Sequence, residues 1–127
     1  MQFGIFLDMG SYVAAEVAGH AGYDVLVLDH EHSPNDFVNA IHSMNAARGT
    51  GAECWVRIPG NDQAYAKRIL DSGADGIMCP MINTAAEVRQ FVSYCRYALL
   101  GDSRLCNDYL SAYLVRVPPR GVLPPGS

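Results

Sequence analysis

Short apolar runs recur along the first 97 residues, and each is followed by a polar loop and an amphipathic segment. The runs are continuous rather than alternating, which is typical of strands buried on both faces of a parallel sheet. Apolar positions in the intervening segments follow helical spacing and predict helices that cover the sheet. The predicted strands are residues 3–7, 25–28, 54–56 and 76–79, and the helices begin near Ser11, at Asn35 or Asp36, at Asn61 and Asp62, and near Asn83 and Thr84.

This pattern predicts an α/β fold of about four parallel βα units joined by right-handed crossovers. The repeating pattern of apolar runs and amphipathic segments ends after residue 97, and residues 98–108 show no strand signal. The last twelve residues contain four prolines and two glycines. We therefore predict an α/β domain over residues 1–97 and an irregular tail over residues 98–127.

Composition narrows the class of protein. A length of 127 residues is typical of a single domain. It is short of the roughly 250 residues that a complete eight-stranded α/β barrel takes. Half of the residues are hydrophobic and 17% are charged, with a mean hydropathy of +0.04, which favours a folded chain over a disordered one.

Charge and hydropathy also exclude classes of partner. The formal net charge of −4 gives no basic field for a phosphate backbone, so we expect no nucleic-acid partner. No apolar run reaches the roughly 20 residues of a membrane span, so we expect no membrane association. The first ten residues lack the basic start of a secretory signal, which predicts a cytoplasmic protein.

Ionisable residues gather where the second and third predicted strands end. Asp29, His30, Glu31 and His32 follow the second strand, and Arg57 ends the third. In parallel α/β folds, functional groups collect at the carboxyl ends of strands. For His30 and Glu31 the favoured interpretation is a solvated loop, whereas for Asp29 and His32 we favour a carboxylate that orients an imidazole. Arg57 is either a snorkelling side chain or a fixed cation for an anionic substrate.

Six stretches then occur in a characteristic order. They are Gly22-Tyr23-Asp24, residues 28–36 (LDHEHSPND), 56–62 (VRIPGND), 67–77 (KRILDSGADGI) and 80–87 (PMINTAAE), and Arg96-Tyr97. Together they resemble the HpcH/HpaI aldolase/citrate lyase family of metal-dependent pyruvate aldolases, and the resemblance covers about residues 3–97. It implies that the four βα units are part of a TIM-type (β/α) barrel.

The resemblance also implies a chemistry. A class II aldolase of this family reversibly cleaves a 2-oxo-4-hydroxy acid to pyruvate and an aldehyde, with a divalent cation (Mg, Mn or Co) that stabilises the enolate. By this resemblance His32 matches the catalytic base, and Asp29 and Glu31 flank it. We assign His32, Asp29 and Arg57 to catalysis. Arg57 matches the arginine that contacts pyruvate, and we assign Glu31 with it to substrate binding.

The resemblance fails where the family places its metal carboxylates. The nearest counterpart is the stretch 114–118, where Arg116 and Pro118 stand in place of a glutamine and of the metal-binding glutamate. We therefore assign no metal ligand in this chain and expect it to be inactive alone. The alternative is a non-catalytic, carboxylate-binding or oligomerising half-barrel. Because a half-barrel leaves one face and one edge of its sheet uncovered, we expect it to self-associate as a homo-oligomer, to pair with another chain, or to bury the opening under its own tail.

Overall fold

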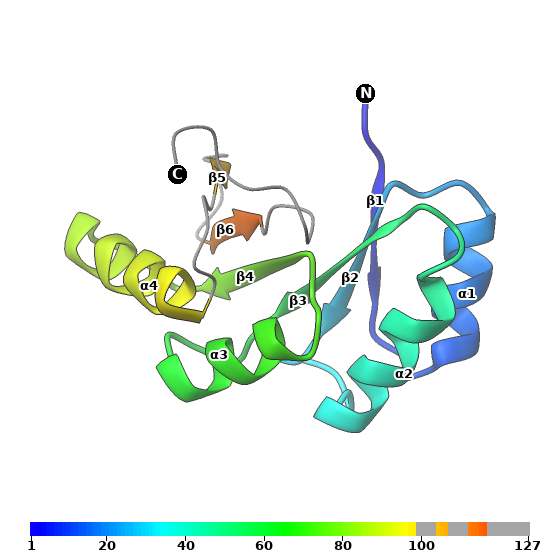
Figure 1. The fold of residues 1–127 in the computed structure, drawn as a ribbon, viewed down its shortest axis with the longest axis horizontal. Coiled ribbons are helices and arrows are strands. Elements are labelled where there is room, and N and C mark those ends of the chain that lie inside the picture. Colours follow the sequence, from blue (N-terminus) through cyan, green and yellow to red (C-terminus); the bar gives the residue numbers. More distant parts are fainter. Residues whose placement is uncertain (99–103, 107–111, 117–127) are drawn as a thin grey trace.

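The computed structural model describes residues 1–98, 104–106 and 112–116, with side chains described up to Cys95. Four βα units follow one another along the chain, and two further strands come after them (Figure 1). The elements are β1 Gly4–Leu7, α1 Tyr12–His20, β2 Val25–Asp29, α2 Phe37–Ala47, β3 Glu53–Arg57, α3 Gln63–Asp71, β4 Gly76–Pro80, α4 Ala85–Ala98, β5 Arg104–Cys106 and β6 Ala112–Arg116.

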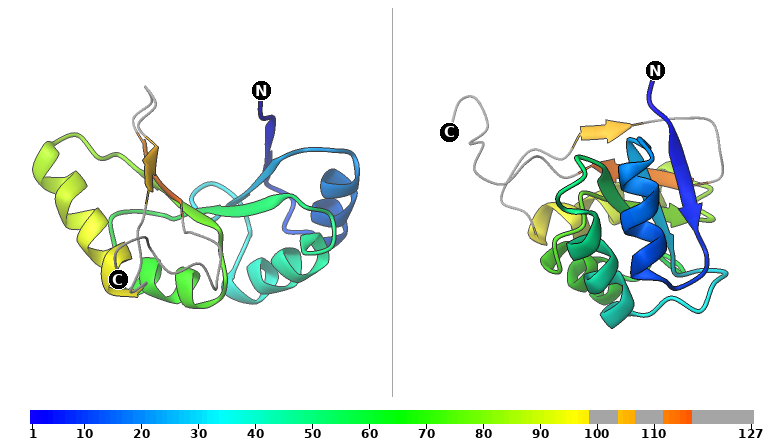
Figure 2. Two further views of the ribbon diagram at one scale, coloured as in Figure 1. Left: turned by 45° about the horizontal axis from the view of Figure 1, so that its top comes forward. Right: turned by 90° about the vertical axis from the view of Figure 1, so that its right-hand side faces the viewer.

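The strands form one sheet in the order β1-β2-β3-β4-β6-β5. Strands β1 to β4 are parallel neighbours in the order in which they occur in the sequence. The four helices follow one another along the outside of the curved sheet (Figure 2). This arrangement confirms the predicted α/β class, with four parallel βα units as in part of a TIM-type barrel.

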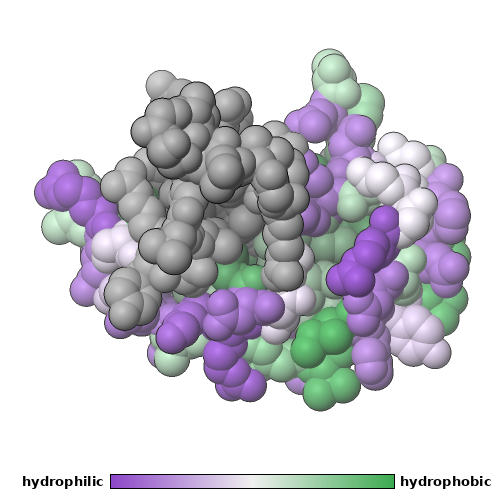
Figure 3. Space-filling view, viewed as in Figure 1, coloured by the Kyte–Doolittle hydropathy of each residue, from purple (hydrophilic) through white to green (hydrophobic). Residues whose placement is uncertain are grey.

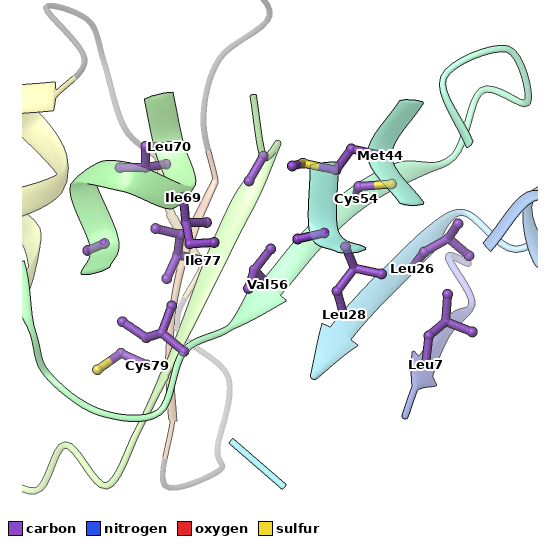
Figure 4. Close-up of a cluster of buried hydrophobic side chains, with 14 of the residues drawn as sticks. Leu7, Leu26, Leu28, Met44, Cys54, Val56, Ile69, Leu70, Ile77 and Cys79 are labelled. Atoms are coloured by element: carbon purple, nitrogen blue, oxygen red, sulfur yellow. The ribbon is translucent and has the colours of Figure 1, made fainter. Parts of the chain in front are cut away.

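The hydrophobic core lies between the sheet and the helices (Figure 4). Leu26 and Leu28 of β2 and Val56 of β3 are fully or almost fully buried there. Burying one such side chain stabilises the fold by about 1.5–3 kcal/mol. Because side chains alternate along a strand, Asp29 and Arg57, which follow Leu28 and Val56, point to the opposite face of the sheet.

The helix starts agree with the sequence. Ser11, Asp36 and Asp62 are N-caps, and each accepts a hydrogen bond from the backbone N–H three residues later, at 3.3, 2.8 and 2.7 Å. Asp36 rather than Asn35 caps the second helix. Gly73, with φ +103°, directly follows the cap of α3, and a glycine in this conformation is typical of the position after a helix end. In the described part of the chain, no helix is both long and apolar enough to cross a bilayer.

The face of α1 that packs on the core is made of small residues, which corrects one expectation. The spacing of Val13, Val17 and Ala18 in the sequence predicts that they share the inward face of this helix, but only Ala18 is buried, and Val13 and Val17 are 51% and 63% exposed. The reason is a close approach: a Cβ on Gly19 would lie 2.4 Å from Thr50 Oγ1, beyond the end of α2. The buried positions of α1 are Ala15, Ala18 and Gly19.

An outer apolar face results on the solvent side of α1 and α2. We use this name for the exposed side chains of Tyr12, Val13, Val17, Val38 and Ile41. Hydrophobic surface is visible over both helices in Figure 3. The ring of Tyr12 meets the ring of His42 edge-on at 6.1 Å, so the exposed parts of α1 and α2 adjoin each other.

The expectation of a wholly irregular tail is wrong for two segments. Strand β6 pairs antiparallel with β4, with Pro80 opposite Ala112 and Gly76 opposite Arg116, and β5 pairs antiparallel with β6. This pairing satisfies backbone groups that β4 would otherwise expose as an edge strand. The stretch 114–118 is therefore not a fifth parallel strand, since β6 runs the other way and ends at Arg116. Residues 117–118 lie outside the described residues, and the division at residues 97/98 stays a prediction.

Candidate functional site

The centre of the site is an ion pair between the ends of β2 and β3. Asp29 and Arg57 are register partners in the parallel ladder, so both side chains leave the same face of the sheet side by side. Arg57 Nε donates to Asp29 Oδ1 at 2.8 Å, and Arg57 Nη2 donates to Oδ2 at 2.7 Å. Asp29 is buried, whereas the Arg57 side chain is 23% exposed. The buried Asp29 carboxylate thus holds the Arg57 guanidinium in place at the protein surface.

Asp29 stays ionised although it is buried. The hydrogen bonds from Arg57 lower the pKa of its carboxyl from 3.8 to about 2, and the backbone N–H groups of Glu31 and His32 act in the same direction against the cost of burial. These two N–H groups donate to Asp29 Oδ1 at 3.0 and 3.4 Å. Asp29 therefore holds the backbone of His32, whereas we expected it to orient the imidazole.

Glu31 and His32 lie beside Arg57 and complete a cluster of polar side chains. Glu31 Oε2 lies 3.4 Å from Arg57 Nε and 3.6 Å from His32 Nε2. The Glu31 side chain is mostly buried, so it is not the solvated loop residue that its position alone suggests. The His32 side chain is 70% exposed. The structure thus brings Asp29, Glu31, His32 and Arg57 together at one edge of the sheet.

The Arg57 guanidinium has a defined orientation. Its Cζ lies 4.9 Å from the centre of the Phe6 ring, and Asp29 takes the edge formed by Nε and Nη2. Among the described residues, no hydrogen bond or ion pair uses Nη1. The second edge, between Nη1 and Nη2, therefore offers donors to an incoming anion. Of the two alternatives for Arg57, the contacts favour the fixed cation.

The loop after β2 is held by its own side chains. The Asn35 amide donates to the carbonyl oxygens of Leu7 at 3.0 Å and Asp29 at 2.9 Å, and to Ser33 Oγ at 2.7 Å. Ser33 Oγ also donates to the carbonyl oxygen of Asp29. Sequence reasoning treated Asn35 only as a possible cap and missed this role, which depends on the proximity of β1 and β2.

His30 is buried, which makes the expectation of a solvated loop residue wrong. Its Nδ1 lies 2.8 Å from Tyr65 Oη, and its ring meets Phe37 and Tyr65 edge-on. Burial lowers the pKa of the imidazole, against the opposing fields of Asp29 and Asp36. The partners of His30 come from α2 and α3, so no local signal in the loop announces its burial.

The described residues do not form a metal centre. No group of three or more His, Cys, Asp or Glu among them is placed to hold an ion. Both carboxylate oxygens of Asp29 are already bonded to the guanidinium. Three of the four cysteines, Cys54, Cys79 and Cys95, are buried and free, and burial raises the pKa of each thiol to about 12. The side chain of Cys106 lies outside the described residues.

The chain is similar to proteins of known activity. Residues 2–119 match the family described as HpcH/HpaI aldolase/citrate lyase, so the match extends past Tyr97. The hydroxypyruvate/pyruvate aldolase of Agrobacterium fabrum is 41% identical over 96 residues, which are 76% of this chain and 36% of that protein. The 5-keto-4-deoxy-D-glucarate aldolase of Klebsiella pneumoniae is 37% identical over 97 residues, or 76% of this chain and 38% of that protein.

Solved structures agree. An HpcH/HpaI family protein from Burkholderia cenocepacia superimposes with a TM-score of 0.70 at 37% identity, covering 73% of this chain and 37% of the other. The HpcH/HpaI aldolase of Desulfitobacterium hafniense gives a TM-score of 0.71 at 31% identity, covering 76% and 38%. The chain thus spans less than two fifths of the length of these relatives.

Proposed function

Since the chain belongs to the HpcH/HpaI aldolase/citrate lyase family, we propose that its site binds a small 2-oxo acid such as pyruvate as part of a class II aldolase or lyase. The reaction of the whole protein would be the reversible cleavage of a 2-oxo-4-hydroxy acid to pyruvate and an aldehyde. The observation that carries the proposal is the Asp29–Arg57 pair, which holds a permanent cation at the carboxyl ends of β2 and β3.

Arg57 is the anchor for the substrate carboxylate. A guanidinium keeps its charge at any physiological pH, and its planar edge matches the two oxygens of a carboxylate. Asp29 fixes the adjacent edge of that plane, so little side-chain freedom remains to be lost when the anion binds. A cation fixed in advance also stabilises negative charge that develops on an oxo acid during enolate formation.

His32 is proposed as the base and Glu31 as a second substrate contact. The exposed imidazole of His32 stands next to the charged group and can accept a proton from a bound oxo acid. Glu31 lies between Arg57 and His32, where its carboxylate can accept a hydrogen bond from a substrate hydroxyl group. Asp29, which we expected to be catalytic, contributes by positioning Arg57 and the loop.

The metal requires separate treatment. The family depends on a divalent cation, here Mg, Mn or Co, which acts as a Lewis acid on the oxo acid when bound. The described residues do not fit such an ion, because no group of three suitable ligands lies among them. We therefore derive no step through the metal and propose that this chain alone does not catalyse cleavage.

One observation favours the alternative function. The anion anchor is complete among the described residues, whereas a metal centre is not. A chain with this combination can act as a non-catalytic carboxylate-binding or oligomerising half-barrel. We further propose a cytoplasmic location and self-association through apolar surface, with no nucleic-acid or membrane partner.

Binding of oxalate, a stable mimic of the pyruvate enolate, tests the proposed function. We expect saturable binding by calorimetry to the full chain, and at least about tenfold weaker binding to Arg57→Lys, because lysine keeps the charge but loses the planar edge and the double contact with Asp29. Arg89→Lys, at an exposed site on α4, is the matched control and should bind as the unaltered chain does. Equal affinity of the two lysine variants would refute the role of Arg57.

A metal titration distinguishes the two functions. We expect no one-to-one binding of Mn²⁺ to the chain, with or without pyruvate, and no release of pyruvate from a 2-oxo-4-hydroxy acid. Calorimetry and a coupled pyruvate assay measure the two quantities. Stoichiometric Mn²⁺ binding accompanied by pyruvate release would show that the chain is itself an aldolase.

A further inference from the structure

Three aromatic side chains from different elements enclose the loop after β2. His30 leaves the end of β2, Phe37 begins α2 and Tyr65 lies in the first turn of α3. The centres of the Phe37 and Tyr65 rings are 4.6 Å apart. Both rings meet the His30 ring edge-on, with centre-to-centre distances of 6.2 Å for Phe37 and 6.1 Å for Tyr65. His30 is 6% exposed. The buried imidazole therefore holds the loop against both α2 and α3.

The two nitrogens of this imidazole have different surroundings. Nδ1 lies 2.8 Å from Tyr65 Oη, whereas Nε2 is buried and has no hydrogen-bond partner among the residues that the structure describes. A buried N–H without an acceptor costs more than a bare nitrogen. The stable neutral form is therefore the one in which Nδ1–H donates to the tyrosine oxygen and Nε2 carries no hydrogen. A proton added at Nε2 would find no acceptor.

Charged groups face His30 from each neighbouring element. Asp29 on β2 and Asp36 at the start of α2 favour the imidazolium through their fields, but burial opposes it more strongly. From α3 come Tyr65 and Arg68, and the guanidinium of Arg68 lies 3.9 Å above the Phe37 ring. The balance keeps the pKa of His30 below its ordinary 6.5. Acidification thus adds a positive charge to the His30 imidazole, and the aromatic surroundings of Phe37 and Tyr65 do not stabilise this buried charge.

His30 is also connected directly to the anion site. Its backbone N–H donates to the carbonyl oxygen of Arg57 at 2.8 Å, and it stands between Asp29 and Glu31 in the sequence. The N–H groups that hold the Asp29 carboxylate belong to the next two residues of the same loop. A displacement of the His30 ring would therefore disturb both the Asp29 carboxylate and Arg57.

We propose that His30 is a positioning residue of the Arg57 anion site, whose neutral imidazole fastens the loop 29–32 to α2 and α3 and whose protonation releases the loop and weakens anion binding. The anion-binding half of this inference rests on the proposed function. The coupling of loop position to His30 protonation does not, because it follows from the aromatic cluster and the backbone bonds.

Oxalate affinity of the full chain as a function of pH tests the proposal. Loss of one buried hydrogen-bonded anchor predicts a fall of roughly threefold to tenfold in affinity as the pH is lowered from 7.5 through the titration of the His30 ring, which is followed in the same samples by its resonance signals. His30→Gln, which does not titrate, should bind with little dependence on pH. His42→Gln, on the outer side of α2, should retain the pH dependence of the unaltered chain.

Affinity that is constant or rises on acidification would overturn the proposal, as would an equal fall in His30→Gln. If His30→Gln does not fold, Tyr65→Phe replaces it: removal of the hydroxyl partner weakens the anchor, so the fall in affinity should move to higher pH. An unchanged profile in Tyr65→Phe would also count against the inference.

Nuclear magnetic resonance separates this inference from the proposed function. If oxalate does not bind at pH 7.5, the proposed function fails, but the His30 ring signals and the amide signals of residues 29–32 and 57 can still be titrated. We expect all of them to change with one common midpoint below pH 6.5. Amide signals that stay constant while the His30 ring titrates would refute the coupling.

Discussion

Asp29 shows how opposing effects are balanced at a single residue. Burial disfavours its charge, but the two hydrogen bonds from Arg57 and the two from the backbone outweigh that cost and hold its pKa at about 2. A carboxyl group whose pKa is depressed in the folded state stabilises that state above the unfolded-state pKa. The contribution is lost as the pH falls from about 4 towards 2.

This balance predicts the acid stability of the protein. The shift from 3.8 to about 2 corresponds to about 2 kcal/mol of folding free energy at neutral pH. We expect Asp29→Asn to be less stable at pH 7 and to lose this part of the acid dependence between pH 4 and pH 2. Urea unfolding at a series of pH values measures it, with the exposed Asp71→Asn as the control. Parallel pH profiles for the unaltered chain and Asp29→Asn would contradict the assignment.

Residue-scale features could be predicted where they depend on strand ends. The sequence placed Asp29 and Arg57 after two buried strands, and a parallel register then brings them together. The bonds within the pair, the second contact of Arg57 with Phe6 and the burial of His30 could not be predicted. They depend on how three βα units lie relative to one another.

At the scale of elements, the α1–α2 contact depends on the absence of a side chain at Gly19. Replacing glycine by alanine inside a helix normally stabilises a protein by about 0.5–1 kcal/mol. Here the new Cβ would lie 2.4 Å from Oγ1 and 2.8 Å from Cβ of Thr50, whose hydroxyl donates to the carbonyl oxygen of Ala47 at 2.7 Å. The steric cost of about 1–3 kcal/mol therefore exceeds the gain.

We predict that Gly19→Ala lowers the free energy of unfolding by about 1–2 kcal/mol. Gly49→Ala is the matched control, because a Cβ there would meet nothing within 4 Å. It should leave stability nearly unchanged. Chemical denaturation of both variants checks the prediction, and a stabilised Gly19→Ala would show that the helices can separate at little cost.

The sequence was sufficient to predict which segments of the four βα units form strands and helices, but not which face of α1 points to the core. Caps and apolar runs located the four strands and helices, because these signals are local. The inward face of α1 was wrongly predicted, since alanine and glycine rather than valine allow the close approach to α2. Strands β5 and β6 were missed, because their pairing depends on the free edge of β4 and not on their own sequence.

At the scale of the whole molecule, apolar surface remains exposed on both the helical side and the sheet side. The outer apolar face covers α1 and α2, and Phe3 and Phe6 are exposed at β1, one of the two edge strands of the described sheet. Exposed apolar side chains that gather on one face of a protein often mark sites of association. An edge strand also offers unpaired backbone groups to a second strand.

We therefore expect the full chain to form an oligomer at micromolar concentration. Light scattering gives the mass, and Val17→Glu should shift the population towards the monomer by placing a charge in the outer apolar face. Glu16→Gln, on the same helix, is the control with the smaller change in polarity. A monomeric unaltered chain that unfolds cooperatively would contradict self-association.

The order of the strands has a consequence for how the molecule forms. Each of β2, β3 and β4 pairs with the strand that immediately precedes it in the chain, as in the partners Gly4 and Val25 or Trp55 and Gly76. A ribosome therefore releases every one of these strands after its template has already emerged. The sheet can grow in the direction of translation, one βα unit at a time, and only short loops need to close at each step.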